Sequence, residues 1–501
     1  MEIIDLVIEG TKVVLDLQSL LILLAGLTLG MVAGALPGFT SGNACAIMLP
    51  ITIGMSTTHA IVFMGAIYAG AQYGGAVPAI LFKVPGTAQA AATALDGYPM
   101  AQQGKADIAL GVSMMASSAG TMISAIVAVF TIIPMARVAL GFGPAEMFLL
   151  ALIGVSIISS VVGSDTKKGM LTGALGFLVA AMPADPYYGL PRLTFGAFEL
   201  YDTMPLVPTL IGLFAIPTIL ALSQTKYIVE VSREEAKKIG GFSRMLGGVI
   251  AAIKKPIQVI SSSLIGTFIG AIPGTGAGIA TFISYGWATT LSKHPETFGK
   301  GNLEGIIAAE ASNNGVSGGA MIPTFALGVP GSGTTAVMLS MITLHGLIPG
   351  PHVVRDHSTM IYGFLVTLFL SGLLIIPIGL IFNSLFSRVT IVRSATLVPV
   401  LLVLSLLGSF GQRLFVFDMY LLLTFGLLGI LLEMYHYPLI PFLFGIILGP
   451  IAESSFIQAI SISRNDPRIF FQSTICKIMW VVIILVFTIP WVIKIFKRRN
   501  A

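Results

Sequence analysis

The chain contains 501 residues, of which 55% are hydrophobic and 10% are charged, and its formal net charge is +5. A soluble domain carries about 25% charged residues, so this composition excludes a soluble enzyme and indicates an integral membrane protein. The basic residues flank apolar segments, so the positive charge does not indicate a nucleic-acid partner. The two cysteines, Cys45 and Cys476, are too few for a disulfide framework or a thiolate metal centre.

Residues 1–223 form the first predicted half. They begin with acidic and apolar residues at helical spacing over 1–17, which indicates an amphipathic helix at the membrane interface. A first span over 19–36 ends at Pro37-Gly38, and the apolar segment 44–54 is too short to cross the bilayer, so it predicts a re-entrant element. The other elements predicted in this half are 57–82, 87–95, 108–135, 145–162, 171–182 and 204–222.

A basic connection over 224–255 separates the halves, and the positive-inside rule places it in the cytoplasm. The second half, 256–473, repeats the plan of the first, and residues 474–501 predict an extra C-terminal helix with a basic cytoplasmic tail. The elements predicted in this half are 256–272, 279–291, 306–347, 360–386, 395–407, 416–434 and 437–451. We therefore predict an all-α integral membrane protein with roughly 10–12 transmembrane helices, arranged as two repeats with broken or re-entrant helices at the membrane midplane.

Gly- and Pro-rich breaks in the first half recur in the second. Gly34-Ala35-Leu36-Pro37-Gly38 matches Gly270-Ala271-Ile272-Pro273-Gly274, Gly74-Gly75-Ala76 matches Gly318-Gly319-Ala320, and Pro78 with Pro85 matches Pro323 with Pro330. Their common order indicates an internal duplication. With a cytoplasmic connection between them, the copies are predicted to be inverted, with the N-terminus outside. Paired broken helices of this kind indicate the binding site of a transporter.

A half-helix that restarts after a Pro-Gly break presents unpaired N–H groups and the positive end of its dipole, which bind anions. Four such starts at one midplane point would suit a small polycarboxylate, whereas the alternative is that their hydroxyls only cap their own helices. The predicted substrate-binding residues are Gly38, Thr40, Ser41, Lys83, Gly86, Thr87, Gly274, Thr275, Asn313, Asn314, Gly331, Ser332, Gly333 and Thr334. At Gly38 and Gly331 the backbone is predicted to approach the ligand or to take a positive φ. No catalytic residue, metal site or bound cofactor is predicted.

Other polar residues also interrupt apolar sequence. The carbonyl oxygens of Asn313 and Asn314 are predicted to bind substrate or a hard cation such as sodium, and the alternative is that these side chains join two helices. A lysine at membrane depth costs roughly 2.5–3.5 kcal/mol, so Lys83 is predicted to contact the substrate or replace a bound cation, or else to reach lipid headgroups. Glu310 either pairs with Lys83 or faces the polar hairpin around His294, and the sequence leaves both open.

Two other functions are compatible with parts of the sequence. Gly315-Val316-Ser317-Gly318 fits the G-x-S-G of rhomboid-type intramembrane proteases, with Ser317 as nucleophile and His345 or His352 as base, but this interpretation leaves the first repeat unexplained. An ion channel would need repeated pore-lining rings, whereas two broken-helix units suit alternating access. We therefore predict a secondary transporter and no enzymatic activity.

The two repeats also carry the motifs of a known family. These are Pro37-Gly38, Tyr73-Gly74-Gly75, Ala79-Ile80-Leu81, Pro85-Gly86-Thr87, Asp96-Gly97-Tyr98-Pro99-Met100, Pro273-Gly274, Asn313-Asn314, Pro323 and Leu327-Gly328-Val329-Pro330-Gly331-Ser332. In their order and spacing, the chain resembles the large membrane subunit of the tripartite tricarboxylate transporters, the TctA family, over nearly its whole length.

The resemblance implies a secondary transporter of the cytoplasmic membrane that imports a tricarboxylate or related small organic acid with a sodium or proton gradient. It also implies two partners, a small membrane subunit of about four helices and an extracytoplasmic solute-binding protein that delivers the substrate. Three positions depart from the family pattern, because Ala76 replaces Ser, Lys83 replaces Asn and Ala309 replaces Pro. These differences bear on which carboxylate is carried and which ion drives it.

Overall fold

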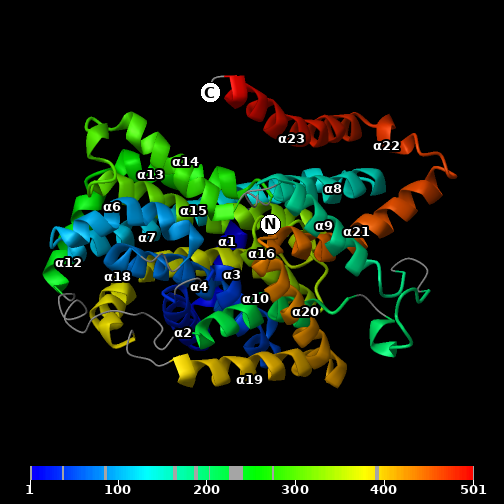
Figure 1. Cartoon of the computed structure of the whole chain (residues 1–501), viewed down its shortest axis with the longest axis horizontal. Helices are drawn as coiled ribbons and strands as arrows, with labels where there is room; N and C mark the ends of the chain where they lie inside the picture. The colour runs from blue at the N-terminus through cyan, green and yellow to red at the C-terminus, as the bar shows by residue number, and fades with distance from the viewer. Residues whose placement is uncertain are drawn as a thin grey trace.

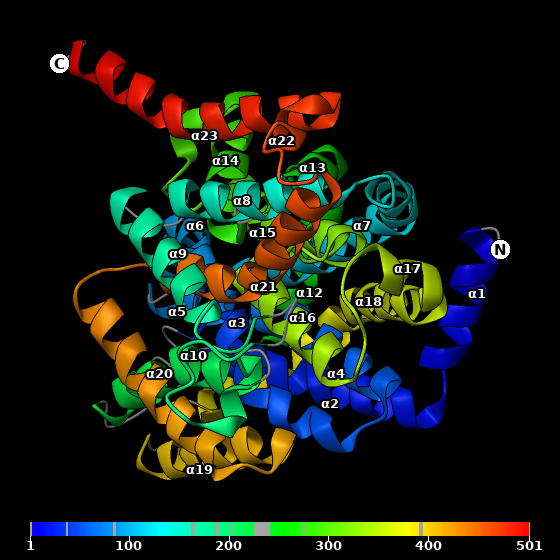
Figure 2. The same cartoon turned by 90° about the vertical axis from the view of Figure 1, so that its right-hand side faces the viewer.

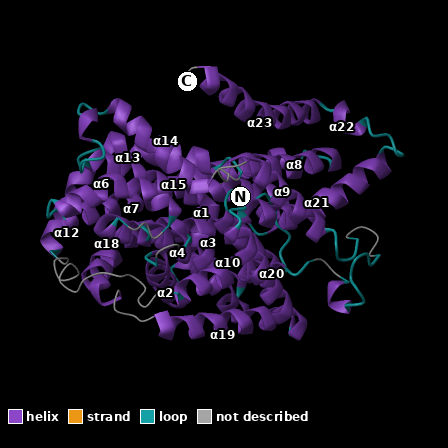
Figure 3. Ribbon diagram, viewed as in Figure 1, coloured by secondary structure: helices purple, strands orange, loops and turns teal. Residues whose placement is uncertain are grey.

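A computed structural model of the chain describes residues 3–36, 39–83, 87–161, 166–185, 190–201, 204–224, 241–273, 276–389 and 394–499 (Figure 1). The regular secondary structure in these ranges is helical, and the ranges include no strand (Figure 3). Many of the helices are long and apolar. The prediction of an all-α integral membrane protein is therefore confirmed.

Seven helices of the described residues are long and apolar enough to cross a membrane. They are α2 (Leu17–Gly34), α4 (Thr57–Gly74) with α5 (Ala76–Phe82), α7 (Ala106–Ala139), α10 (Leu206–Ser223), α18 (Ser358–Val389), α20 (Val416–Met434) and α21 (Leu439–Ile462). The pair α12 (Phe242–Ile253) and α13 (Pro256–Gly270), bent by 80°, is an eighth if it forms one span.

The remaining elements include shorter helices and helices with more polar residues. They are α1 (Ile3–Val14), α3 (Ser41–Met48), η1 (Leu49–Gly54), η2 (Ala88–Ala90), α6 (Ala91–Gln102), α8 (Pro144–Val161), α9 (Thr166–Ala180), η3 (Phe198–Leu200), α14 (Gly276–Leu291), η4 (Pro295–Thr297), α15 (Leu303–Leu327), α16 (Gly333–Leu344), α17 (Pro351–Asp356), α19 (Ser394–Arg413), α22 (Ile469–Gln472) and α23 (Thr474–Arg499).

Each Pro-Gly break predicted from the sequence separates two helical elements. The breaks lie between α2 and α3, between α5 and η2, between α13 and α14, and between α15 and α16. The short apolar segment predicted as re-entrant forms α3 and η1. Of the basic connection predicted over 224–255, residues 225–240 lie outside the described residues and the later part contains α12. The boundaries of the two halves stay predictions.

The internal duplication is visible in how helices pack. Helix α2 packs on α4, and α13 packs on α15, through glycines that let the backbones approach closely. In the first copy, a Cβ at Gly30 would lie 2.5 Å from the Ile67 carbonyl oxygen, and a Cβ at Gly70 would lie 2.3 Å from that of Leu27. In the second copy, a Cβ at Gly266 would lie 2.2 Å from the Ser312 carbonyl oxygen, and a Cβ at Gly315 would lie 2.5 Å from that of Ser263. Each contact of the first pair recurs in the second, so the two copies share one packing geometry.

The register of the duplication differs by one residue from the motif match. A Cβ at Gly74 would lie 2.2 Å from the Met31 oxygen, and a Cβ at Gly319 would lie 2.2 Å from the Thr267 oxygen. Met31 and Thr267 lie one helical turn after the equivalent residues Leu27 and Ser263. Gly74 therefore corresponds to Gly319, and its match to Gly318 was wrong, because two consecutive glycines in each copy permit both alignments.

The helices before the second break of each copy end in the same way. Helix α5 ends at Lys83 with φ 58°, and α15 ends at Gly328 with φ 72°. The N–H of each residue donates to the carbonyl oxygen of an earlier proline, Pro78 in the first copy and Pro323 in the second. A left-handed residue of this kind closes a helix by satisfying one of its last carbonyl groups. The proline and the left-handed residue after it therefore form one duplicated helix end.

The helix that precedes the spans of each half packs on a long helix of the other half. Helix α1 packs along α18 (Figure 2), and α12 packs along α7. A Cβ at Gly10 of α1 would lie 2.7 Å from the backbone of Gly363, and a Cβ at Gly111 of α7 would lie 1.9 Å from the Met245 oxygen. The two halves are therefore interlocked at both of these contacts.

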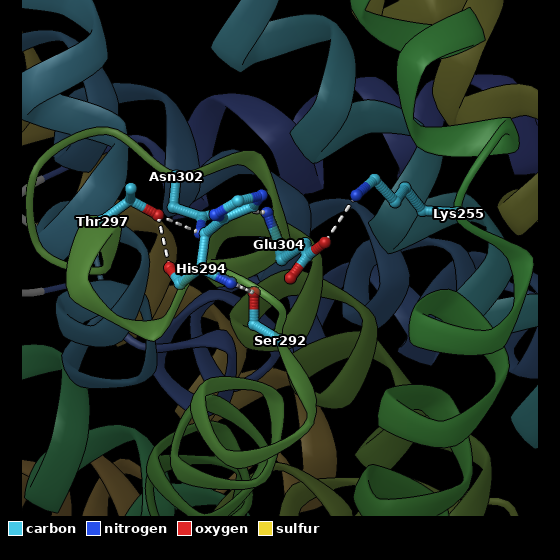
Figure 4. Close-up of polar contacts among 6 residues, drawn as sticks. All are labelled: Lys255, Ser292, His294, Thr297, Asn302 and Glu304. Atoms are coloured by element: carbon cyan, nitrogen blue, oxygen red, sulfur yellow. Dashed lines mark hydrogen bonds and ion pairs between the residues drawn. The ribbon is translucent and has the colours of Figure 1, made fainter.

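The N-terminus of α15 is fixed by the polar hairpin before it. Figure 4 shows Lys255, at the start of α13, paired with Glu304 in the first turn of α15. Asn302 caps the helix by accepting from the Glu304 N–H at 2.7 Å, and its own amide donates to Thr297 at 2.7 Å. A side-chain cap of this type satisfies N–H groups that have no partner inside the helix. These contacts set the position of α15, which carries most of the buried polar groups discussed below.

Candidate functional site

Helix α15 is covered by other helices along nearly its whole length, including α7, α13 and α14 (Figure 1). It nevertheless carries six polar side chains that are at most 1% exposed, which are Glu310, Ser312, Asn313, Asn314, Ser317 and Thr324. Buried polar groups in a membrane protein are costly unless they have partners, and they commonly mark ligand or ion pathways. The partners of these side chains therefore define the candidate site.

One row of partners comes from α7, and we call the contact the α7–α15 seam. Ser117 Oγ donates to Glu310 Oε2 at 2.8 Å, Asn314 Nδ2 donates to Thr121 Oγ1 at 2.9 Å, and the Gly318 N–H donates to Ser124 Oγ at 3.2 Å. These hydroxyls were not among the residues predicted from the sequence. Ser113, Ser117, Thr121 and Ser124 recur at helical spacing inside an apolar span, which is the signal that could have found them.

A second contact lies where α4 crosses α15. Gln72 Nε2 donates to the Asn313 carbonyl oxygen at 3.1 Å, and Asn313 Nδ2 donates to the Gln72 carbonyl oxygen at 3.2 Å. Asn313 therefore joins two helices, as one of the two interpretations predicted. The side-chain oxygens of Gln72, Asn313 and Asn314 are buried without a hydrogen-bond partner among the described residues. These oxygens remain available to a ligand or a cation.

Two half-helix starts from different halves of the chain meet directly. Ser41 Oγ, in the first turn of α3, lies 2.8 Å from Thr334 Oγ1, in the first turn of α16. The flanking hydroxyls serve their own helices, because Thr40 accepts from the Asn43 N–H at 3.1 Å and Ser332 accepts from the Thr335 N–H at 3.3 Å. The structure thus assigns capping to Thr40 and Ser332, and a contact between halves to Ser41 and Thr334.

The elements that follow the other two breaks, η2 and α14, form a second pair. Helix α14 packs against η2 and α6, so this pair also combines one element from each half. Thr87, just before η2, is 1% exposed, and its hydroxyl has no hydrogen-bond partner among the described residues. The first and fourth starts therefore meet directly, and the convergence of all four at one point stays a prediction. Each repeat contributes to both pairs, which a single sequence could not indicate.

Four of the predicted site residues, Gly38, Gly86, Gly274 and Thr275, lie outside the described residues. Gly331 lies in the break before α16, where its N–H donates to Thr324 Oγ1 at 3.2 Å. A Cβ at Gly331 would lie 2.7 Å from the Cα and oxygen of Ala320, whereas a Cβ at Gly333 would meet only Ile440 at 3.6 Å. The Gly331 backbone therefore makes a close approach to α15. Its φ is not among the positive values found for other glycines, so the approach is the reason for glycine there.

Glu310 lies away from both partners that the sequence left open. Its carboxyl accepts from Thr93 Oγ1 of α6 and from Ser117 Oγ of α7. Lys83 is exposed instead, and its Nζ lies 5.8 Å from the centre of the Tyr98 ring. The alternatives of a Glu310–Lys83 pair and of a contact with the hairpin around His294 were therefore wrong. The role of Lys83 in substrate binding stays a prediction.

The left-handed backbone of Lys83 leads to a prediction about stability. A residue with a Cβ is strained at this φ by about 1 kcal/mol relative to glycine, which the second copy has at the equivalent position. Lys83→Gly is therefore expected to raise the midpoint of thermal unfolding in detergent above that of Lys83→Ala. Both variants lose the charge and the contact with Tyr98, so the comparison isolates the backbone. Equal midpoints would show that the backbone relaxes there without strain.

The protease alternative finds no support in the geometry around Ser317. Its hydroxyl donates to the carbonyl oxygen of Asn314 in the same helix at 2.6 Å, and the side chain is fully buried. Its described contacts include no histidine. A serine nucleophile needs a base within hydrogen-bond reach, so the described geometry does not assemble that chemistry.

Comparison with known proteins agrees with this arrangement. The profile of the family described as "Tripartite tricarboxylate transporter TctA family" matches residues 20–444. A protein of Agrobacterium vitis, "Uncharacterized 52.8 kDa protein in TAR-I ttuC' 3'region", is 30% identical over 479 residues, which cover 95% of this chain and 93% of that protein. A second, "Uncharacterized protein in TAR-II ttuC' 3'region" from the same organism, is 30% identical over 210 residues, which cover 42% of this chain and 87% of that protein.

No solved structure matches the chain. The family profile covers most of the residues that form both repeats, both pairs of helix starts and the α7–α15 seam. The described apolar helices make the chain a multi-pass membrane protein. The chain belongs to the tripartite tricarboxylate transporter TctA family, and is therefore a membrane subunit of a transporter that works with partner subunits.

Proposed function

We propose that this subunit imports a small carboxylate, a tricarboxylate or a related organic acid, across the cytoplasmic membrane by ion-driven alternating access. The observation that carries the proposal is the contact between Ser41 of α3 and Thr334 of α16. Two helix N-termini from different halves meet there, and both present N–H groups and the positive ends of their dipoles. An anionic carboxyl group is the ligand that such a pair of helix ends favours.

The contact also suits a moving site. Because α3 and α16 belong to different halves, a displacement of one half against the other opens or closes the space between the two helix starts. Alternating access requires a site whose two walls move relative to each other. In this proposal Ser41, Thr334 and the N–H groups around them bind the substrate, and Thr87 contributes a hydroxyl at the second pair. The three unpartnered amide oxygens near the crossing of α4 and α15 provide ligands of the kind that a hard cation prefers.

The proposed partners are a small membrane subunit of about four helices and an extracytoplasmic binding protein that delivers the substrate. Membership of a tripartite transporter family supports partner subunits in general. The basic residues after Ile493, which include Lys497, Arg498 and Arg499, favour a cytoplasmic C-terminus. The basic connection over 224–255, together with inverted copies, favours an N-terminus on the outer side.

The test is uptake of radiolabelled acids into proteoliposomes that contain the complex. Citrate, succinate and lactate serve as probes with three, two and one carboxyl groups, and sodium and proton gradients are imposed separately. We expect saturable uptake that requires the binding protein. Uptake that does not saturate and proceeds without a binding protein would instead support a channel.

The helix-start contact is tested in the same assay with Thr334→Val. Loss of one hydroxyl at the site is expected to lower uptake about fivefold or more. Thr343→Val is the matched control, because Thr343 lies on the same helix and its hydroxyl donates only to the Leu339 carbonyl oxygen within that helix at 3.0 Å. Equal uptake by both variants would remove the support that this contact gives to the proposal.

A further inference from the structure

Glu310 is a fully buried carboxyl at the junction of three helices. Its side chain comes from α15, and its oxygens accept from Thr93 of α6 and from Ser117 of α7, the latter at 2.8 Å. Ser113 Oγ of α7 also lies beside the carboxyl and has no other hydrogen-bond partner among the described residues. All four side chains are 0% exposed. A carboxyl group in this position is surrounded by hydroxyls and shielded from water.

Among the groups that the structure describes, this carboxyl has no positively charged partner. Among the described residues, no Lys, Arg or His nitrogen lies within ion-pair distance of it. The titratable groups on the surrounding helices have other partners. Tyr73 of α4 accepts from Asn383, and Asp96 of α6 accepts from Tyr285 of α14 and from the Gly301 and Asn302 N–H groups. Asp107 of α7 pairs with Arg244, and Lys255 before α13 pairs with Glu304 toward the end of α15. An ionised carboxylate without a cation is costly at such a place.

The duplication provides an internal control for the role of this residue. By the register of the glycine contacts, the position of Glu310 on α15 corresponds to Gly65 on α4. Gly65 packs against the ring of Phe364 and the methyl group of Thr367 on α18. The same helix crossing is therefore built in the first copy without a carboxyl group. Packing does not require Glu310, so its presence needs a functional reason.

The hydroxyls around Glu310 can serve both of its protonation states. The ionised form accepts hydrogen bonds from Thr93 and Ser117, as the structure shows. The protonated form carries one O–H donor and needs an acceptor, which the free Ser113 Oγ supplies, because a hydroxyl group can donate or accept. The hydroxyls of α6 and α7 can therefore bind this carboxyl in either protonation state. Helix α6 continues from η2, one of the elements of the second pair of helix starts.

We propose that Glu310 binds the coupling proton, so that each carboxylate is imported together with a proton that this side chain accepts from the outer solution and releases to the cytoplasm. The inference rests on the proposed function, because it names the driving ion of the same carrier. One O–H bond forms on a Glu310 oxygen in the outward-facing state and breaks in the inward-facing state, and water supplies and accepts the proton. Asp96 lies on α6 about one turn after Thr93, and it accepts from the Gly301 and Asn302 N–H groups just before the start of α15.

The test uses proteoliposomes that contain the full complex, and it separates transport of the acid from the coupling of that transport to protons. Exchange of labelled for unlabelled acid at equal pH on both sides needs the carrier but no net proton movement. Accumulation driven by an imposed pH gradient needs both. The probe is whichever of citrate, succinate or lactate gives the largest flux with the parent protein. For Glu310→Gln, we expect exchange to persist and proton-driven accumulation to fall about tenfold or more.

Glu433→Gln is the matched control, because Glu433 lies exposed at the end of α20 and loses the same charge. Accumulation by Glu310→Gln equal to that of the parent would overturn the inference, as would accumulation by the parent that responds to sodium and not to pH. A parent protein that shows no exchange would overturn the proposed function itself, which is a different result.

A second variant covers the case in which Glu310→Gln does not fold. Thr93→Val removes a donor to the ionised carboxylate and leaves the carboxyl in place. The pH profile of accumulation is expected to move to higher pH, because the ionised state loses a hydrogen bond that stabilises it. A structural role for Thr93 would lower activity at every pH without moving the profile, and that outcome would count against Glu310 as the proton site.

Discussion

Gly331→Val is expected to abolish transport while the protein still inserts into the membrane. A Cβ at this position would lie 2.7 Å from the backbone of Ala320 on α15, too close for any side chain. Either α15 or the break before α16 must move, and strain of this kind costs about 1–3 kcal/mol. The movement displaces the start of α16, where Thr334 meets Ser41. Uptake in proteoliposomes and the amount of protein in the membrane are measured together.

Gly286→Ala is the control for this variant. Gly286 lies on the half-helix α14, and a Cβ there would meet nothing within 4 Å. Alanine also favours the helical state over glycine by about 1 kcal/mol, so this variant should insert and transport like the parent. If Gly331→Val transports at the parent rate, the break before α16 is a simple bend and the close approach to Ala320 has no part in transport.

Arg413→Gln is expected to cause the largest loss of stability. Arg413, at the end of α19, donates to both carboxylate oxygens of Asp418 on α20 and to the Glu199 carbonyl oxygen at 2.9 Å. The Asp418 side chain is 0% exposed. Removal of the arginine leaves a buried charge without its partner, which costs about 3–5 kcal/mol. The midpoint of thermal unfolding in detergent should fall accordingly.

The chain contains a matched control for this pair. Arg355 donates to Asp356 in the same two-bond geometry, but the two side chains are 58% and 48% exposed. Exposed pairs contribute about 0–1 kcal/mol, so Arg355→Gln should leave the midpoint almost unchanged. Arg413→Gln combined with Asp418→Asn should recover part of the loss, because the buried charge is then gone. Equal midpoints for the two single variants would show that Asp418 reaches solvent.

The sequence predicted the parts of the fold that depend on the backbone. Proline and glycine restrict or free the main chain wherever they occur, so Pro37, Pro85, Pro273 and Pro330 indicated the four breaks without knowledge of their surroundings. The duplication was visible for the same reason. The predicted alignment of the two copies was wrong by one residue at Gly74 and Gly318. Each copy has two consecutive glycines there, and the sequence does not show which of them faces a neighbouring helix.

The parts that depend on partners could not be predicted. Ser117 and Thr121 are ordinary residues in an apolar span until α15 places Glu310 and Asn314 against them. The pairing of α3 with α16 follows from the arrangement of two copies in space, and one linear sequence does not specify that arrangement. The position of Glu310 in apolar sequence could be seen, but the predicted pair with Lys83 was wrong. Lys83 has the complementary charge, and the sequence does not show that it lies away from Glu310 in the fold.

The packing of α1 on α18 and of α12 on α7 has a consequence for biosynthesis. The surface of α7 that α12 covers is made before α12 is synthesised, and α1 is made long before its partner α18. Neither half can complete its own packing during translation. The early helices must wait in the membrane with their contact surfaces uncovered, so the final fold closes only after α18 has left the ribosome.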